Sequence, residues 1–277
     1  MYKHKIILWL CLCFISNVTM AAFSKSIWSK WVKHNPCSQE IISHQEWQNF
    51  LRKHVVTNSE GIHLIDYPNL SKKDFNTVSE YISRLSHISI ESYNRNEQLA
   101  YWINLYNALT VQLIIENYPI DSIQQINISP GLFSIGPWGA PIVNIATIPL
   151  SLDDIHNRII RPIWNDPRTH YAINDATIGG ANISNQAFDG KHIDQQLTKA
   201  SFDYINSLRG VQLIEGKLIL SKIYEWYVDD FGENDMDIIH HLMIYANEPL
   251  RKDLEHMTSI NSYIYNWHLN TTISPTQ

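Results

Sequence analysis

The chain has 277 residues, of which 44% are apolar, 17% charged and 11% aromatic. This composition excludes a disordered protein and a collagen-like repeat, and a chain of this length can bury a core without disulfide bonds. Its 21 Lys and Arg residues stand against 27 Asp and Glu residues, which gives a formal net charge of −6. An acidic balance argues against a nucleic-acid partner and against attraction to an anionic membrane surface.

Residues 1–21 have the pattern of a secretory signal peptide. Two lysines precede an apolar run over 6–18, and small residues follow up to Ala21. The run is too short for a membrane-spanning helix, which needs roughly 20 apolar residues. We therefore expect cleavage near Ala21, a mature chain over 22–277, and a periplasmic or secreted protein without a membrane span.

Cys37 is the one thiol that this cleavage leaves in the chain. The mature protein then has no internal disulfide, and the loss of two lysines changes its net charge to −8. Cys37 lies in a polar segment, whereas a reactive thiol needs a pocket that lowers its pKa. We do not expect it to be a nucleophile.

Two amphipathic helices are predicted near the start of the mature chain. Each begins at a capping box, in which a Ser side chain and an acidic side chain three residues later satisfy each other's backbone N–H groups. The boxes are 43–46 and 71–74, and apolar residues follow them at helical spacing up to Val55 and Leu85. Both helices are expected to pack on the core.

The segment 96–117 has almost no polar face, which predicts a helix that is buried on all sides. Asn104 and Asn107 are three residues apart and so share one face of it. A buried amide without hydrogen bonds costs about 1–3 kcal/mol. The two side chains therefore either line a polar cleft, as candidate binding residues, or hold a neighbouring loop in place.

The middle of the chain is predicted to consist of a loop and two short elements. Pro and Gly residues mark 130–141 as the loop, and Trp138 within it is a candidate surface aromatic for ligand binding. A strand follows over 142–148. A short helix begins at a Ser151 cap and stops at Pro162.

Short strands and helices alternate irregularly in the rest of the chain. They are a strand over 169–174, a helix over 194–208, a hairpin over 211–220 that turns at 215–216, a helix over 222–228 capped by Ser221, a helix over 235–246 and a further helix that begins near Pro249. Helices thus bracket a few strands without a regular βαβ repeat. This predicts an α+β fold, a mostly helical single domain over 22–277 packed around a small sheet.

Five ordered motifs resemble the domain-of-unknown-function 547 (DUF547) family. They are YWINLYNA at 101–108, SLDDI at 151–155, DPRTHYA at 166–172, LSKIYEWY with DF within 220–231, and YNWHLN at 265–270. The resemblance covers roughly 90–270. It implies a fold distantly like those of papain-like or transglutaminase-like thiol enzymes.

The chain departs from this family where thiol chemistry would lie. Relatives carry Cys-Ala-Ser and Gly-Cys-Pro stretches after the Asp-Pro-Arg motif, whereas this chain has Asp-Ala-Thr at 175–177 and Gly-Gly-Ala at 179–181. An Ile-Glu-His stretch of the family is Ile-His-Asn at 155–157, and a final Asp-Trp is Asn-Trp at 266–267. The resemblance therefore implies that inherited covalent chemistry is absent.

Three residues are candidates for catalysis: His156, His170 and Asp175. A carboxylate can act as a general base, and a histidine can act as base or acid. In an extended segment His170 and Asp175 would lie about 16 Å apart, so a dyad needs a sharp turn between them. Otherwise His170 holds the Asp-Pro-Arg turn, in which Arg168 is a candidate binding residue. No recognised metal-ligand spacing or cofactor motif occurs, and we predict no metal site and no cofactor.

Two hypotheses for the function remain. The first is an exported, non-catalytic binding or scaffolding protein, related to thiol hydrolases, that takes a small-molecule, peptide or glycan ligand. The second is a hydrolase of peptide or cell-wall amide bonds that uses Asp175 with His156 or His170. Both place a groove near these residues and the helix of Asn104 and Asn107.

Overall fold

The computed structural model describes residues 26–273, so the predicted signal peptide, 1–21, lies outside the described residues. The helices and strands, in chain order, are α1 (Gln45–His54), β1 (Val55–Thr57), β2 (His63–Ile65), α2 (Lys72–Ser86), α3 (Arg95–Asn117), β3 (Val143–Ile145), β4 (Ile148–Leu150), α4 (Arg161–Trp164), α5 (Ile193–Ile205), β5 (Val211–Ile214), β6 (Lys217–Ser221), α6 (Lys222–Trp226), α7 (Val228–Phe231), α8 (Asp235–Tyr245), α9 (Glu248–Leu254) and β7 (Ser262–Ile264).

Helices dominate the fold, and the strands form small separate sheets. Strands β1 and β2 pair antiparallel, as do β3 and β4, while β5, β6 and β7 form a three-stranded sheet in which β6 and β7 are parallel. This arrangement confirms the predicted α+β class. The single domain over 22–277 stays a prediction.

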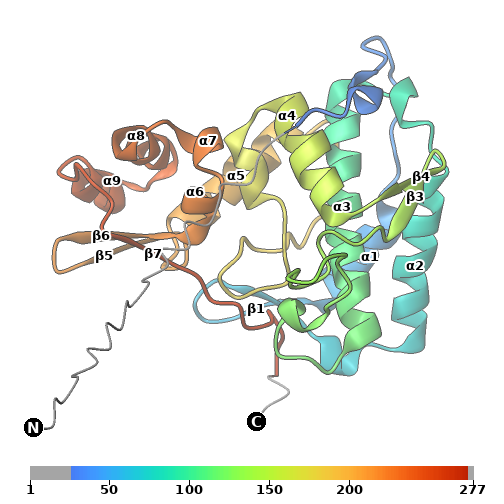
Figure 1. Ribbon diagram of the computed structural model, residues 1–277, viewed down its shortest axis with the longest axis horizontal. Helices are drawn as coiled ribbons and strands as arrows, with labels where there is room; N and C mark the ends of the chain where they lie inside the picture. The colour runs from blue at the N-terminus through green and yellow to red at the C-terminus, as the bar shows by residue number, and fades with distance from the viewer. Residues whose placement is uncertain (1–25, 274–277) are drawn as a thin grey trace, which may run out of the picture.

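The buried apolar side chains form two clusters. The first joins α1, α2 and α3 with β3, β4 and the segment before α4, and the second joins β5 and β6 with α6, α7 and α8. Figure 1 shows the elements of the second cluster to the left of those of the first. The two clusters meet around 170–181, which contributes side chains to both.

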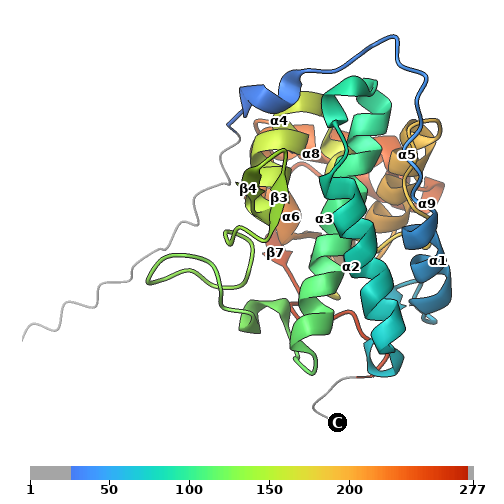
Figure 2. The same ribbon diagram turned by 90° about the vertical axis from the view of Figure 1, so that its right-hand side faces the viewer.

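Helix α3 is the centre of the first cluster. It contacts α2 on one side, as Figure 2 shows, and α5 and the segment before α4 on others. Residues 97–111 of the helix are therefore all buried, while its two ends are partly exposed. This explains why its sequence is apolar all round and confirms the predicted buried helix. Asn94 caps its start by accepting hydrogen bonds from the N–H groups of Asn96 and Glu97.

Asn104 and Asn107 hold two loops against α3. The Asn104 amide donates to the carbonyl of Phe188 at 2.8 Å and accepts from the same residue's N–H at 3.0 Å. The Asn107 amide donates to the carbonyl of Ala172 and accepts from the N–H of Asn174, both at 2.9 Å. Of the two alternatives left by the sequence, the structure therefore shows loop anchoring.

Two predicted strands are wrong in detail. The segment 142–148 belongs to a hairpin of β3 and β4, whose turn places Ala146 and Thr147 at positive φ. The alternating apolar pattern hid this turn because neither residue is a typical turn former. The segment 169–174 is not a strand, because a 3₁₀ helix covers Pro167–Tyr171 and begins with the Asp166 side chain accepting from the N–H of Arg168.

Two predicted helix boundaries are also corrected. The box at 43–46 does not cap α1, since the Glu46 carboxylate pairs instead with Arg84 at 2.8 Å. The helix after Ser151 does not stop at Pro162 either. A π-helical segment, Asp154–Ile160, continues directly into α4, where the proline occupies the first turn and needs no N–H partner.

Other local predictions are confirmed. Ser71 and Asp74 form the reciprocal capping box of α2, and the Ser221 side chain caps α6. Strands β5 and β6 form the predicted hairpin, with Glu215 and Gly216 both at positive φ in its turn. Strand β7, which adds a parallel third strand to this hairpin, was not predicted.

Replacing Asn104 or Asn107 with Ala should destabilise the fold, because each change leaves a loop N–H and a loop C=O unpaired in the core. We expect each variant to lower the free energy of unfolding by about 2–4 kcal/mol, measured by urea denaturation. Asn96→Ala, at an exposed position of α3, is the control and should change it by less than about 0.5 kcal/mol. Equal effects at all three positions would contradict the anchoring role.

Candidate functional site

A pocket of about 540 Å³ lies where segments far apart in the sequence converge. Tyr106 of α3 contributes to its lining together with residues of the 129–139 loop, of the 173–181 segment, of α6 and of the C-terminal segment after β7. A pocket of this size takes a small ligand or one unit of a longer chain. Its lining includes aromatic rings, histidines and two carboxyl groups.

Aromatic side chains line one part of this pocket. Tyr265 lies 4.7 Å from Trp267 and 4.8 Å from Trp226, measured between ring centroids. Trp138 meets Trp267 edge to face at 5.9 Å. Trp138 is partly exposed, as expected for a ligand-contacting aromatic of the 130–141 loop. These rings hold one another in place and form a stacking surface of defined shape.

A buried ion pair lies beside the histidines. The Asp230 carboxylate of α7 accepts from Nε of Arg161 at 2.5 Å and contacts Nε2 of His170 at 2.8 Å. Arg161 also donates to the side chain of Asn157 at 2.9 Å, and its guanidinium lies 4.7 Å from the ring of Tyr227. A buried charge is tolerated only when it is paired in this way. Asp230 therefore fixes the orientation of the His170 ring.

His156 comes from the π-helical segment and lies against His170 and Tyr227, with both ring centroids 5.1 Å away. Burial, with the nearby His170 and Arg161, holds the pKa of His156 well below its usual value. The ring is thus neutral at neutral pH. Its Nε2 atom is buried and has no hydrogen-bond partner among residues 26–273.

Asp175 lines the same pocket but has different partners. The hydroxyl groups of Tyr265 and Thr177 donate to its carboxyl, the latter at 2.7 Å. Burial nevertheless outweighs these hydrogen bonds and raises the pKa of Asp175. Burial, with the neighbouring Asp154, also raises the pKa of Asp153, the second carboxyl of the pocket.

Gly180 makes room for the Asp175 carboxyl. A Cβ atom at position 180 would lie 2.3 Å from Oδ1 of Asp175, 3.0 Å from the Thr177 hydroxyl and 3.1 Å from the Tyr265 hydroxyl. No side chain fits there without displacing the carboxyl. The stretches 175–177 and 179–181 are therefore in direct contact.

The structure brings together four of the seven candidate site residues. His156, His170, Asp175 and Trp138 all line the pocket, so the two histidines and the aspartate share one cavity. The carboxylate next to His170 is Asp230, however, and not Asp175. Whether any of these residues catalyses a reaction stays a prediction.

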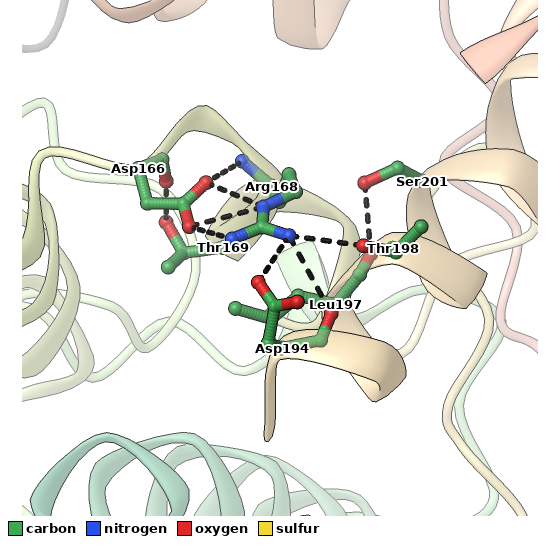
Figure 3. Close-up of polar contacts among 7 residues, drawn as sticks. All are labelled: Asp166, Arg168, Thr169, Asp194, Leu197, Thr198 and Ser201. Atoms are coloured by element: carbon green, nitrogen blue, oxygen red, sulfur yellow. Dashed lines mark hydrogen bonds and ion pairs between the residues drawn. The ribbon is translucent and has the colours of Figure 1, made fainter. Parts of the chain in front are cut away.

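Asn104, Asn107 and Arg168 do not line the pocket. Figure 3 shows Arg168 between two carboxylates, Asp166 at 2.7 Å and Asp194 at 2.8 Å, with a further hydrogen bond to Thr198 at 2.9 Å. These contacts tie the 3₁₀ helix to the start of α5. The guanidinium of Arg168 is thus engaged by two carboxylates, which gives it a structural role in this conformation.

Sequence reasoning missed several residues of this site. Arg161 and Asp230 form the ion pair beside the pocket, and Tyr227, Tyr265 and Asp153 belong to its lining. Tyr227, Asp230 and Tyr265 all lie within motifs that carry the family resemblance. Membership of those motifs, rather than local chemistry, was the signal that could have found them.

The described residues contain one free cysteine and no cluster of side chains suited to a metal ion. Within residues 26–273 no group of three or more His, Cys, Asp or Glu side chains is placed to hold a metal ion. Cys37 is exposed and unpaired. No helix of this range combines the length and the apolar character needed to cross a bilayer.

Residues 90–205 match the sequence model of a family described as "Protein of unknown function, DUF547". This segment is therefore a DUF547 region of the chain. The segment supplies α3, the 129–139 loop, both histidines and Asp175, so the pocket is built mainly from the DUF547 region. No curated protein and no solved structure matches the chain.

The Asp175→Asn variant should alter how stability depends on pH. The folded protein holds the Asp175 proton more tightly than the unfolded chain, in which the pKa of Asp is about 3.9. The wild type therefore loses stability as the pH rises from about 4 to the raised pKa, by about 1.4 kcal/mol per unit of the shift. The Asn variant lacks this loss, so denaturation curves should show its relative stability rising over that window.

Asp253→Asn, at an exposed position of α9, is the control for this experiment, and its difference from the wild type should stay constant with pH. A constant difference for Asp175→Asn as well would show that the carboxyl titrates as it does in the unfolded chain.

Gly180→Ala should destabilise the fold by about 1–3 kcal/mol, because the new methyl group collides with Asp175. Gly139→Ala is the matched control in the same pocket, since its nearest atom would be the Ser129 hydroxyl at an ordinary 3.5 Å. The penalty for Gly180→Ala should shrink in an Asp175→Ala background. Additive penalties in chemical denaturation would rule out the contact as its cause.

Proposed function

We propose that this DUF547 protein is exported and binds a short peptide or glycan fragment in its aromatic pocket. The observation that carries this proposal is the wall formed by Trp138, Trp226, Tyr265 and Trp267 around a cavity of about 540 Å³. Aromatic faces stack on sugar rings and on apolar side chains, and a cavity of this size fits one such group.

The surroundings of the pocket favour an extended ligand. A second, shallower groove of about 500 Å³ shares Gln124, Tyr265 and Trp267 with the pocket. Its other lining residues are polar: Asp121, Ser122, Asn266 and His268. One unit of a chain can therefore lie in the aromatic pocket while the next forms hydrogen bonds in the groove.

The electrostatics of the pocket favour an uncharged group. The pKa of His156 lies well below its usual value, so the ring is neutral. Burial raises the pKa values of Asp153 and Asp175, so the pocket disfavours charge at both carboxyls. The charged side chains nearby, Arg161 and Asp230, are paired with each other. N-acetylated sugars and the backbone of small peptides meet this requirement.

Hydrolysis of an amide bond is the second candidate, and the two histidines favour it. Asp230 holds His170 through Nε2, which is how a carboxylate orients a catalytic base. Asp175, with its raised pKa, could hold a proton for a leaving group. We rank binding first because the lining contains no cysteine and because Asp175 is engaged by Tyr265 and Thr177 rather than by a histidine.

Ligand binding can be tested with triacetylchitotriose and tri-alanine as probes on residues 22–277. We expect one of them to raise the melting temperature of the wild type. The Trp267→Ala variant should bind about tenfold more weakly, because Trp267 lines both the pocket and the groove. Trp28→Ala, which removes a tryptophan outside the pocket, should bind like the wild type.

Affinities are to be taken from titrations of tryptophan fluorescence within each variant, so that differences in stability do not enter the comparison. Failure of both probes to bind the wild type, or equal affinities for the wild type and Trp267→Ala, would contradict the proposed site. Release of alanine from tri-alanine, or of acetate from triacetylchitotriose, that stops in both His170→Gln and Asp175→Asn would favour amide hydrolysis instead.

A further inference from the structure

The segment 122–152 carries no charged side chain and no histidine. It follows α3, contains β3 and β4, and includes the loop that lines one side of the pocket. In a protein with an acidic balance, the exposed residues of this 31-residue segment form a surface without charge. Any partner that buries this surface has no charge to desolvate.

The two most exposed large apolar side chains of the described residues, Leu132 and Phe133, lie in this segment. Leu132 is 97% exposed and Phe133 is 94% exposed, while Ile135 and Ile128 are 65% and 51% exposed. Figure 2 shows the loop between α3 and β3 projecting away from the helices. We call Ile128, Leu132, Phe133 and Ile135 the apolar tip.

Hydrogen bonds within the loop hold the apolar tip in this projecting position. The Ser129 hydroxyl donates to the carbonyl of Gly136 at 2.7 Å and accepts from the N–H of Gly139 at 3.0 Å. The Ser134 hydroxyl donates to the carbonyl of Pro130 at 2.6 Å. These hydrogen bonds close the loop at its base. The apolar side chains of the tip are left facing solvent, although exposure of apolar surface to water is unfavourable.

We propose that the apolar tip inserts into the interfacial region of an uncharged lipid bilayer. The four side chains expose on the order of 600 Å², which falls below the roughly 800 Å² per partner of a stable protein interface. A lipid surface needs no matching shape and accepts a few apolar side chains to a depth of about 5–10 Å. The absence of charge points to zwitterionic rather than anionic lipid.

Insertion of the apolar tip would place the pocket next to the lipid surface. Pro130, Ser134 and Ile135 of the same loop also line the pocket. The binding site would then open toward molecules at or near the membrane. This inference concerns the apolar tip and is independent of which ligand the pocket takes.

The test is sedimentation of residues 22–277 with vesicles of pure phosphatidylcholine. We expect reversible binding that 0.5 M NaCl does not weaken, because burial of apolar surface, and not charge, drives it. The Leu132→Ser, Phe133→Ser double variant should bind at least tenfold more weakly. Both positions are exposed, so the variant should keep the stability of the wild type.

Leu208→Ser with Ile244→Ser is the matched control, since these side chains are 77% and 70% exposed at positions outside the loop. This control should bind vesicles within about twofold of the wild type. No vesicle binding by the wild type, or equal losses in the two double variants, would overturn the proposal. It would equally be overturned if sedimentation equilibrium showed a dimer that the tip variant abolishes while neither protein binds vesicles.

Discussion

The buried carboxylate of Asp230 connects the parts of the molecule that form the site. It belongs to α7, which contributes to the second hydrophobic cluster. Its partners come from other elements: Arg161 begins α4, and His170 lies in the 3₁₀ helix Pro167–Tyr171. Breaking a buried ion pair typically costs 3–5 kcal/mol, because the remaining charge has no compensation. The contact therefore fixes α4, α7 and the 3₁₀ helix of His170 relative to one another.

The π-helical segment makes this contact possible. Between Ser151 and α4 the wider turns place His156 near His170 and allow Asn157 to accept from Arg161. π-helical turns are rare and occur often at functional sites. Here the turn puts a neutral histidine beside the paired one, which gives the pocket polar atoms without adding net charge.

Local rules in the sequence predicted the parts of the fold that depend on neighbours along the chain. The capping box of Ser71, the cap at Ser221 and the turn at Glu215 need only a few residues each, and the spacing of Asn104 and Asn107 placed both amides on one face of α3. The π-helical turn could not be predicted, because the apolar pattern at 154–160 fits an ordinary helix equally well.

Long-range contacts were beyond such rules. In the sequence, Asp175, five residues away, was the candidate carboxylate partner of His170. The partner in the structure is Asp230, which is 60 residues away in a helix of the second cluster. The strand predicted over 169–174 failed for a related reason. Its β-branched and aromatic residues favour a strand, but Asp166 and Pro167 start a 3₁₀ helix that Arg168 then ties to α5.

The carboxyl of Asp175 has a physical consequence for the whole pocket. A carboxyl needs more hydrogen bonds than a thiol, and Tyr265 and Thr177 supply them, while Gly180 supplies the space. Tyr265 in turn stacks with Trp226 and Trp267, so the carboxyl and the aromatic wall form one connected unit. A nucleophile would have to release its hydrogen-bond donors to attack a substrate. In this structure the Asp175 carboxyl keeps the hydroxyl groups of Tyr265 and Thr177 as donors. The contacts that hold the Asp175 carboxyl thus also hold the ring of Tyr265 in the aromatic wall.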